Sequence, residues 1–381
     1  NSLLFRAVKQ KASDIHIEPF ERELKIRFRI NGILYDIMTP PKRAQNSIIS
    51  RVKIMSQLNI AEKRVPQDGR IRIKIAGKDI DIRISTIPTA HGESVVMRLL
   101  DASSVLLDID SLGFSRGNLD QFKKLLEHHN GIILVTGPTG SGKTTTLYSA
   151  LSKLNTNEVK IITVEDPVEY QLYGVNQMQV NPKIDLTFAS GLRAFLRQDP
   201  DIIMVGEVRD RETAEIAIQA SLTGHLVLST LHTNDAPSSI TRLVEMGVEP
   251  FLVASSVLGI AAQRLVRTVC HDCARKYVPE LEELTEVGLA PEDLKGKQIY
   301  KPVGCPNCME TGYAGRAGIH EILVVSDLVR AELMKGSDAT TIKKVAVAQG
   351  MRTLREDAAA KVIQGLTTIA EVLRVTQEDS D

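Results

Sequence analysis

The stretch that decides the fold is residues 134–151, LVTGPTGSGKTTTLYSAL. It contains the phosphate-loop pattern G-x-x-x-x-G-K-T at 137–144, and the apolar run 132–135 before it is typical of a buried strand. In such a loop the backbone N–H groups and a helix N-terminus face the phosphates, Lys143 adds positive charge, and the Thr144 hydroxyl can bind Mg²⁺. The predicted ATP-binding residues are Gly137, Pro138, Thr139, Gly140, Ser141, Gly142, Lys143, Thr144 and Thr145.

From Phe114 onward, short apolar strands alternate with helical stretches. The predicted strands are 132–135, 161–164, 202–205 and 226–228. Continuous apolar strands separated by helices indicate a parallel sheet covered on both faces, which is an α/β fold. The apolar run 251–262 is too short to cross a bilayer and is interpreted as a core helix.

The first hundred residues have a different pattern. Residues 24–30, LKIRFRI, alternate apolar with basic side chains, and Asn31-Gly32 then forms a strong hairpin signal. The same alternation returns in 70–85 around a turn at Gly77. We therefore expect an α+β N-terminal domain with a half-buried, largely antiparallel sheet.

These patterns predict several parts along the chain. All four cysteines lie within 270–308, and beyond about residue 326 the apolar spacing is helical, with a capping signal at Ser337-Asp338. The acidic end, 378–381, is interpreted as a solvated tail. The expected parts are 1–101 (α+β domain), 102–113 (linker), 114–265 (nucleotide-binding core), 266–318 (tetracysteine subdomain) and 319–381 (helical subdomain).

Composition limits the function classes. Lys plus Arg and Asp plus Glu number 47 each, so no overall basic field points to a nucleic-acid partner. We expect no membrane-spanning segment and see no signal peptide. Because the chain begins Asn-Ser without a methionine, we expect that an N-terminal region precedes it.

Carboxylates follow two of the predicted strands, where a doubly wound sheet places its ligand. TVEDPVE at 163–169 supplies Glu165 and Asp166, and VGEVRD at 205–210 supplies Glu207. Glu207 is the first candidate for polarising the attacking water, although polar strand ends are also common without function. Gly206 stands where a Mg²⁺-binding aspartate is usual, so metal binding must rely on Thr144 and on waters held by these acids.

Two histidines flank the strand predicted at 226–228. His232 and His225 could each sense the γ-phosphate by hydrogen bonding, or each could simply satisfy a buried turn.

The cysteines form two knuckles, Cys270-x-x-Cys273 and Cys305-x-x-Cys308. Four thiolates supplied in pairs suit a tetrahedral, structural Zn²⁺ site. A redox disulfide pair is the alternative, and it is weakened because nothing in the sequence indicates a thioredoxin-like unit.

Several motifs together resemble one family. With the phosphate loop, the stretches ITVEDPVEY (162–170), LRAFLRQDPDIIMVGEVRD (192–210) and GHLVLSTLHTND (224–235) resemble the Walker A, Asp box, Walker B and His box of the secretion-superfamily ATPases. That family powers type II secretion and type IV pilus assembly. SDIHIEPF (13–20) and VPQDGR (65–70) resemble its second N-terminal domain.

The resemblance, closest to the type II secretion branch, implies a RecA-like core after a PAS-like α+β domain. It also implies that the Gly-Glu ending of the Walker B strand is the family form. Assembly-type members carry a tetracysteine subdomain, which agrees with zinc.

The same resemblance implies a cytoplasmic homohexamer that hydrolyses ATP with Mg²⁺ and drives pseudopilus assembly and protein export. Its expected location is the cytoplasmic face of the inner membrane, held there by platform proteins of the GspL and GspF types. A type IV pilus assembly ATPase, a nucleic-acid motor and an inactive nucleotide-sensing scaffold stay open as alternatives.

Arginines are the last candidates. Arg83 and Arg98 lie at polar positions of alternating strands, and nothing in their own domain obviously claims them. They are either part of a solvated basic face or, as the resemblance supports, arginines that reach the γ-phosphate. Arg193, Arg197 and Arg209 flank the Walker B strand and would add positive charge there or across a subunit boundary.

Overall fold

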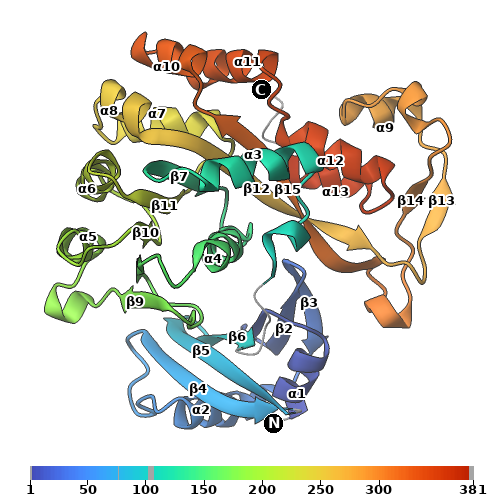
Figure 1. Ribbon diagram of the computed structural model, residues 1–381. Coiled ribbons are helices and arrows are strands. Elements are labelled where there is room, and N and C mark those ends of the chain that lie inside the picture. The colour runs from blue at the N-terminus through green and yellow to red at the C-terminus, as the bar shows by residue number, and fades with distance from the viewer. Residues whose placement is uncertain (1, 76, 102–106, 377–381) are drawn as a thin grey trace. The chain divides into compact units, whose positions relative to one another are not determined.

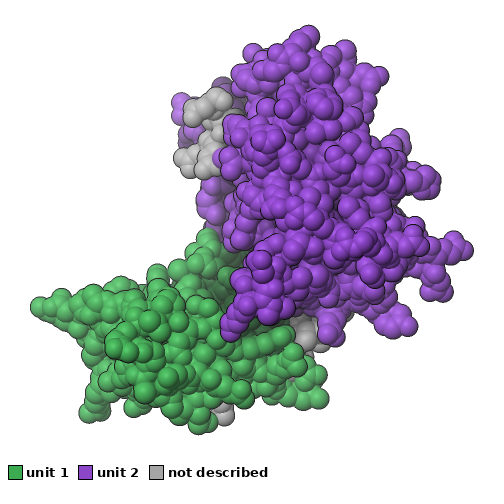
Figure 2. Space-filling view, turned by 90° about the vertical axis from the view of Figure 1, so that its left-hand side faces the viewer, with its two compact units in different colours: residues 1–105 green, residues 106–381 purple. Residues whose placement is uncertain are grey.

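A computed structural model describes residues 2–75, 77–101 and 107–376. The chain divides into two compact units, Asn1–Val105 and Leu106–Asp381, which Figure 2 shows in different colours. Residues 102–106, the first part of the expected linker, lie outside the described residues.

Unit 1 is built on a six-stranded antiparallel sheet with the order β3-β2-β1-β6-β5-β4. The predicted α+β unit with an antiparallel sheet is confirmed. Among the described residues of this unit, two helices and a short 3-10 turn accompany the strands. The elements are α1 (Ser2–Lys9), β1 (Asp14–Pro19), β2 (Leu24–Ile30), β3 (Ile33–Met38), η1 (Lys42–Ala44), α2 (Gln45–Met55), β4 (Gln67–Ile75), β5 (Lys78–Thr89) and β6 (Gly92–Asp101).

Strand β2 shows why this sequence forms a half-buried sheet. Its apolar side chains are buried, while the basic residues between them are partly exposed on the other face. Asn31 and Gly32 then have φ values of 51° and 87°, which a two-residue hairpin turn of the primed type requires. The hairpin predicted from Asn31-Gly32 is therefore confirmed.

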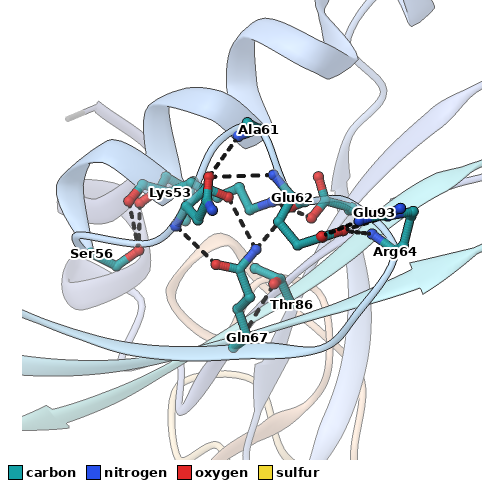
Figure 3. Close-up of polar contacts among 10 residues, drawn as sticks. Lys53, Ser56, Ala61, Glu62, Arg64, Gln67, Thr86 and Glu93 are labelled. Atoms are coloured by element: carbon teal, nitrogen blue, oxygen red, sulfur yellow. Dashed lines mark hydrogen bonds and ion pairs between the residues drawn. The ribbon is translucent and has the colours of Figure 1, made fainter.

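Polar contacts hold the segment that joins α2 to β4 (Figure 3). Lys53 of α2 is buried and forms an ion pair with Glu93 of β6. Its Nζ also donates to the Glu62 carbonyl oxygen at 2.7 Å, and Gln67 Nε2 donates to the same oxygen at 2.9 Å. The segment is thus fixed to both the helix and the sheet.

Unit 2 contains a seven-stranded sheet with the order β15-β12-β7-β11-β10-β8-β9 (Figure 1). All neighbouring strands are parallel except β15, which runs antiparallel to β12. The four predicted strands are present, whereas β9, β12 and β15 were not predicted. The strands are β7 (Gly131–Thr136), β8 (Ile161–Glu165), β9 (Val175–Gln179), β10 (Ile202–Val205), β11 (Leu226–Leu231), β12 (Val257–Val269) and β15 (Tyr313–Val324).

Helices cover both faces of this sheet, as predicted for an α/β fold. Ile133 and Val135 of β7 belong to a core formed with α3 (Arg116–Leu126) and α4 (Lys143–Leu154). Their neighbours along β7 pack into a second core on the opposite face. That core includes α5 (Phe188–Phe195), α6 (Arg211–Leu222), α7 (Pro237–Glu245) and α8 (Pro250–Ser256).

The core helix expected over 251–262 is wrong for its second half. Helix α8 ends at Ser256, and β12 begins at Val257. Strand β12 lies between β7 and β15, and its first part, 257–262, is largely buried, so this part of the sequence is continuously apolar and does not alternate. Such a run cannot be distinguished from a buried helix by periodicity alone.

The expected boundaries of the tetracysteine part also differ from the structure. Strand β12 crosses the boundary at 265/266, and β15 crosses the one at 318/319, so both boundaries fall inside strands of the main sheet. The elements between these strands lie to one side of the sheet in Figure 1. They are β13 (Arg275–Tyr277), α9 (Leu281–Glu286), η4 (Pro291–Leu294), β14 (Ile299–Lys301) and η5 (Pro306–Cys308).

The second part of the expected linker packs on unit 2. Ile109, in the 3-10 turn η2 (Ile109–Ser111), is buried in the core with α3 and α4. Ser149 Oγ of α4 donates to the Leu107 carbonyl oxygen at 2.6 Å. From residue 107 the chain therefore belongs to unit 2.

The C-terminal region is helical, as predicted. Helix α10 (Asp327–Met334) packs against α8, α11 (Ala339–Ala348) against α7, α12 (Leu354–Ile363) against β15, and α13 (Ile369–Thr376) against β12. The predicted cap is confirmed at Asp338, which accepts a hydrogen bond from the Thr341 backbone N–H at 3.0 Å. The acidic end, 378–381, lies outside the described residues. Across 2–75, 77–101 and 107–376, none of the helices combines the length and apolarity needed to cross a membrane.

Candidate functional site

The phosphate loop joins β7, an interior strand of the sheet between β12 and β11, to the N-terminus of α4. Gly137, Gly140 and Gly142 have φ values of 143°, 81° and 92°, which side chains rarely adopt. A Cβ at Gly137 would lie 2.3 Å from the backbone oxygen of Gln263, so only glycine fits there. The loop is therefore closely packed against β12.

Lys143 lies at the start of α4 and folds back over the loop. Its Nζ donates to the carbonyl oxygens of Gly137 at 2.6 Å and Pro138 at 3.1 Å. Burial lowers the pKa of Lys143 to about 8, although the Glu207 carboxylate opposes this shift. The loop, the lysine and Glu207 thus belong to one site.

Glu207 and His232 meet where β10 and β11 end. His232 Nε2 lies 3.3 Å from Glu207 Oε2, and Arg209 forms an ion pair with the same carboxylate. The backbone before Glu207 is held in place because Thr230 Oγ1 donates to the Gly206 carbonyl oxygen at 2.7 Å. The structure therefore brings together the two residues favoured from the sequence for the reaction.

Glu165 is placed differently from Glu207. It is 3% exposed at the end of β8, where its carboxylate accepts from Tyr148 Oη, from Thr163 Oγ1 at 2.5 Å and from Gln177 Nε2 at 3.1 Å. Burial raises the pKa of Tyr148, with Glu165 adding to the shift. Asp166, the next residue, is exposed. Glu165 is thus a buried, hydrogen-bonded acid that holds α4 to the sheet.

The phosphate-sensing role considered for His225 is wrong within this chain. Strand β11 runs parallel to β7, with Leu226 beside Gly131 and Leu231 beside Thr136. The phosphate loop follows Thr136, so His225 lies at the opposite edge of the sheet. Its Nδ1 lies 2.7 Å from the Ala220 carbonyl oxygen at the end of α6, which is the buried-turn alternative.

The arginines around the Walker B strand take three different positions. Arg209 contacts Glu207, as described above, while Arg193 of α5 forms an ion pair with Glu212 in the first turn of α6 at 2.5 Å. Arg197 is exposed and donates to the Arg193 carbonyl oxygen at 3.2 Å. Of these three arginines, Arg209 is the one that lies at the pair formed by Glu207 and His232.

In unit 1, the interpretation that Arg98 has no obvious partner in its own domain is wrong. Arg98 Nε donates to Asp14 Oδ1 at 2.9 Å, and Arg29 Nε lies 3.7 Å from the other oxygen of the same carboxylate. Arg83 of β5 is directly opposite Arg98 of β6. The two arginines therefore form one row across the sheet with Asp14.

Gln263 is a site residue that the sequence analysis missed. It lies on β12 beside the phosphate loop, is 3% exposed, and bonds both the loop and α4. Its signal was a lone amide at the end of the apolar run 251–262, a position where a buried polar group needs partners.

The cysteines come together at the far end of β12 and β15. The Sγ atoms of Cys270, Cys273, Cys305 and Cys308 all lie within 4.8 Å of one another. Separations of 3.9, 3.7 and 3.6 Å match the roughly 3.8 Å expected between thiolates at tetrahedral Zn–S distances of about 2.3 Å. The separations are well beyond the roughly 2.05 Å of a disulfide bond.

Backbone groups also favour the thiolate form of Cys308. The N–H groups of Cys305 and Gly312 each donate to Cys308 Sγ at 3.2 Å. Burial opposes ionisation of Cys308, but these donors outweigh it and lower the pKa of the thiol to about 7. The donor set and its surroundings fit a structural zinc ion.

A phosphate loop after an interior parallel strand, with a carboxylate and a histidine from neighbouring strand ends, defines a P-loop protein of the ATPase class. Comparison with known proteins narrows this class. The family described as "Type II/IV secretion system protein" matches residues 1–374, and the chain belongs to this family.

Three relatives show how similar the chain is to known members in sequence. The chain is 54% identical over 379 residues to Type II secretion system protein E of Pectobacterium carotovorum subsp. carotovorum, covering 100% of this chain and 75% of the relative. It is 52% identical to Type II secretion system ATPase E of Vibrio cholerae, with 99% and 75% covered. It is 53% identical to Type IV pilus assembly ATPase PilB of Thermus thermophilus, with 98% and 42% covered.

Solved structures share the fold. The ATPase DotB of Legionella pneumophila superposes with a TM-score of 0.73 at 23% identity, over 99% of this chain and 94% of that chain. The pilus retraction motor PilT with bound ADP gives 0.64 at 25% identity, over 98% and 96%. The first likeness supports the fold alone.

Proposed function

We propose that this chain hydrolyses ATP to ADP and phosphate and uses that reaction to drive protein export by a type II secretion system. The observation that carries the proposal is the pairing of Glu207 with His232 at the edge of the sheet where Lys143 and the phosphate loop lie. The relatives named type II secretion protein E, at 52–54% identity, support the coupling to secretion.

In this proposal each residue has one task. The N–H groups of the loop and the start of α4 hold the β- and γ-phosphates, and Lys143 balances their negative charge. Glu207 accepts a hydrogen bond from the attacking water and aims it at the γ-phosphorus, while His232 orients the Glu207 carboxylate.

A magnesium ion fits the donor set of this site. Thr144 Oγ1 would hold it, together with waters that accept their orientation from the Glu207 and Asp166 carboxylates, and it would neutralise charge on the phosphates when bound. Glu165 is reserved for positioning because its oxygens are already engaged by Tyr148 and its neighbours.

In this proposal the arginines of unit 1 couple ATP hydrolysis to movement of the domains. An arginine that contacts the γ-phosphate of ATP but makes no contact with ADP favours one arrangement of the two units while ATP is bound. Hydrolysis removes the contact and so releases that arrangement. We assign this task to Arg83 and Arg98. Arg193 and Arg197 are exposed and are assigned to contacts between subunits of a homohexamer.

The proposed setting is the cytoplasmic face of an inner membrane. The chain would be held there by platform proteins of the secretion system, and the motor would push assembly of a pseudopilus. The tetracysteine group would bind Zn²⁺ and stabilise the segment between β12 and β15, with no open coordination position for catalysis.

Type IV pilus assembly is the second candidate, favoured by 53% identity to PilB of Thermus thermophilus. Two chimeras separate the candidates. In one, this chain replaces the matching segment of the Pectobacterium type II protein E, and in the other, the matching segment of PilB. We expect the first chimera to restore enzyme secretion in a strain lacking its own protein. Restoration of pili alone would favour the second candidate, and a Glu207→Gln chimera controls for hydrolysis in both.

A further inference from the structure

We infer that Gln263 is a positioning residue that sets the shape of the phosphate loop, and this rests on the proposed ATPase function. No motif of the sequence analysis includes it. Its placement follows from strand register: Ala262 of β12 pairs with Thr136 of β7, so Gln263 lies beside Gly137, the first residue of the loop.

The direction of its side chain follows from strand geometry. Side chains alternate across a sheet, and Ala261 belongs to the core with α3 and α4, so Gln263 faces the same side. That side carries the loop and α4. Gln263 is therefore directed at the phosphate loop, which the proposed reaction needs in a fixed conformation.

Two hydrogen bonds engage both ends of its amide. Gln263 Nε2 donates to the Ser141 carbonyl oxygen at 2.8 Å, and Gln263 Oε1 accepts from Thr146 Oγ1 at 2.6 Å. A carbonyl oxygen only accepts, so the Ser141 contact settles which end of the amide is the nitrogen. All three groups are buried, where an unsatisfied polar group is costly.

The bond to Ser141 has a specific result. In a planar trans peptide the C=O and the following N–H point in opposite directions. Holding the Ser141 carbonyl toward Gln263 therefore turns the Gly142 N–H away from β12, and this N–H is one of those that the loop offers to phosphate. The bond to Thr146, in the first turn of α4, fixes the helix N-terminus by the same amide.

The test compares substitutions that differ in these bonds. Gln263→Leu keeps the size but removes both bonds, and Thr146→Val keeps the shape of threonine without its hydroxyl. Thr146→Ser keeps the hydroxyl and should recover most of the loss. The control is Gln219→Leu, the same exchange at an exposed position of α6.

We expect Gln263→Leu to weaken binding of a fluorescent ATP analogue at least tenfold and to lower kcat/KM by at least as much. Thr146→Val should lose a smaller factor in the same direction. Thermal unfolding without nucleotide should also show some loss, because the buried Ser141 carbonyl and Thr146 hydroxyl then lack a partner, so ATP binding is compared at a temperature where parent and variants are all folded.

Two results overturn the inference. One is Gln263→Leu with ATP affinity, kcat and KM within twofold of the parent. The other is Thr146→Ser with a loss as large as that of Thr146→Val, which would make the hydroxyl irrelevant. Should Gln263→Leu fail to fold, the pair of Thr146 variants decides the matter.

Failure of the proposed function looks different. In that case the parent would not hydrolyse ATP, or Lys143→Ala would bind the analogue as the parent does. Loss of binding in Lys143→Ala beside unchanged binding in the Gln263 and Thr146 variants would reject only the positioning role.

Discussion

Arg98 and Asp14 form a hydrogen-bonded ion pair across the unit 1 sheet, with Arg98 Nε donating to Asp14 Oδ1 at 2.9 Å. Asp14 is buried and Arg98 is more than half exposed, so the carboxylate holds the arginine at the surface of the sheet. An Arg98 that serves the γ-phosphate must exchange this carboxylate for phosphate. Partner exchange of this kind can be measured.

Substitution of the two residues should therefore have opposite consequences for turnover. Arg98→Ala should lower ATP turnover at least tenfold, because the γ-phosphate loses a cation. Asp14→Asn should keep turnover or raise it, because Arg98 is released. Steady-state kinetics with thermal unfolding of both variants checks this. Equal loss of activity and of stability in both would leave Arg98 a purely structural role.

Glu207→Gln should reduce turnover by about 10²–10⁴-fold while ATP still binds, because the amide no longer polarises water but keeps the shape of the side chain. His232→Ala should give a smaller reduction, since it only orients the carboxylate. Single-turnover hydrolysis and equilibrium binding separate the two steps. Near-normal hydrolysis by Glu207→Gln would transfer the role to Asp166.

Lys143 predicts a pH dependence of stability in the nucleotide-free protein. Its pKa is lowered from 10.5 to about 8 in the folded state, so between these values the unfolded chain binds more protons than the folded one. Stability from this group should therefore rise with pH from about 8 to 10.5, by at most roughly 3 kcal/mol.

Lys143→Met removes the titrating group and should flatten that rise. The measurement is the free energy of unfolding in urea at pH 7.5 and 9.5, taken as the difference between parent and variant so that other groups cancel. An identical slope in both proteins would contradict a buried Lys143 with a lowered pKa.

Replacing Cys270 and Cys273 by serine should release zinc and destabilise the segment between β12 and β15, because metal-binding free energy is folding free energy in such sites. ATP binding should survive, since the phosphate loop has its own contacts. Elemental analysis of the parent and thermal unfolding of the variant are the checks. A parent without zinc would count against the metal site itself.

The central fold was predictable because its signals are local. The loop glycines and the apolar strands before and after them each occupy a short window of sequence, and the hairpin at Asn31-Gly32 depends on two residues only. Strand β12 was not predictable, because a strand buried on both faces has the same composition as a buried helix.

The candidate site residues likewise include some that local sequence reveals and some whose position depends on the fold. His225 and His232 look alike in sequence, yet the length of β11 places them at opposite edges of the sheet. Arg98 and Asp14 are 84 positions apart, so their pairing depends on the order of strands in the sheet. Gln263 reaches Ser141 only because β12 and β7 share a particular register.

Strand β12 is thirteen residues long, so at about 3.3 Å per residue it extends roughly 40 Å. The part of β12 that pairs with β7 ends beside the phosphate loop. The rest of the strand pairs with β15 and leads directly into Cys270. The strand that shapes the phosphate loop therefore also carries the cysteines, so one continuous backbone connects the two places. The register shift between Arg267 and Val269 is an irregularity of the kind that bends a strand and increases its twist just before the first cysteine.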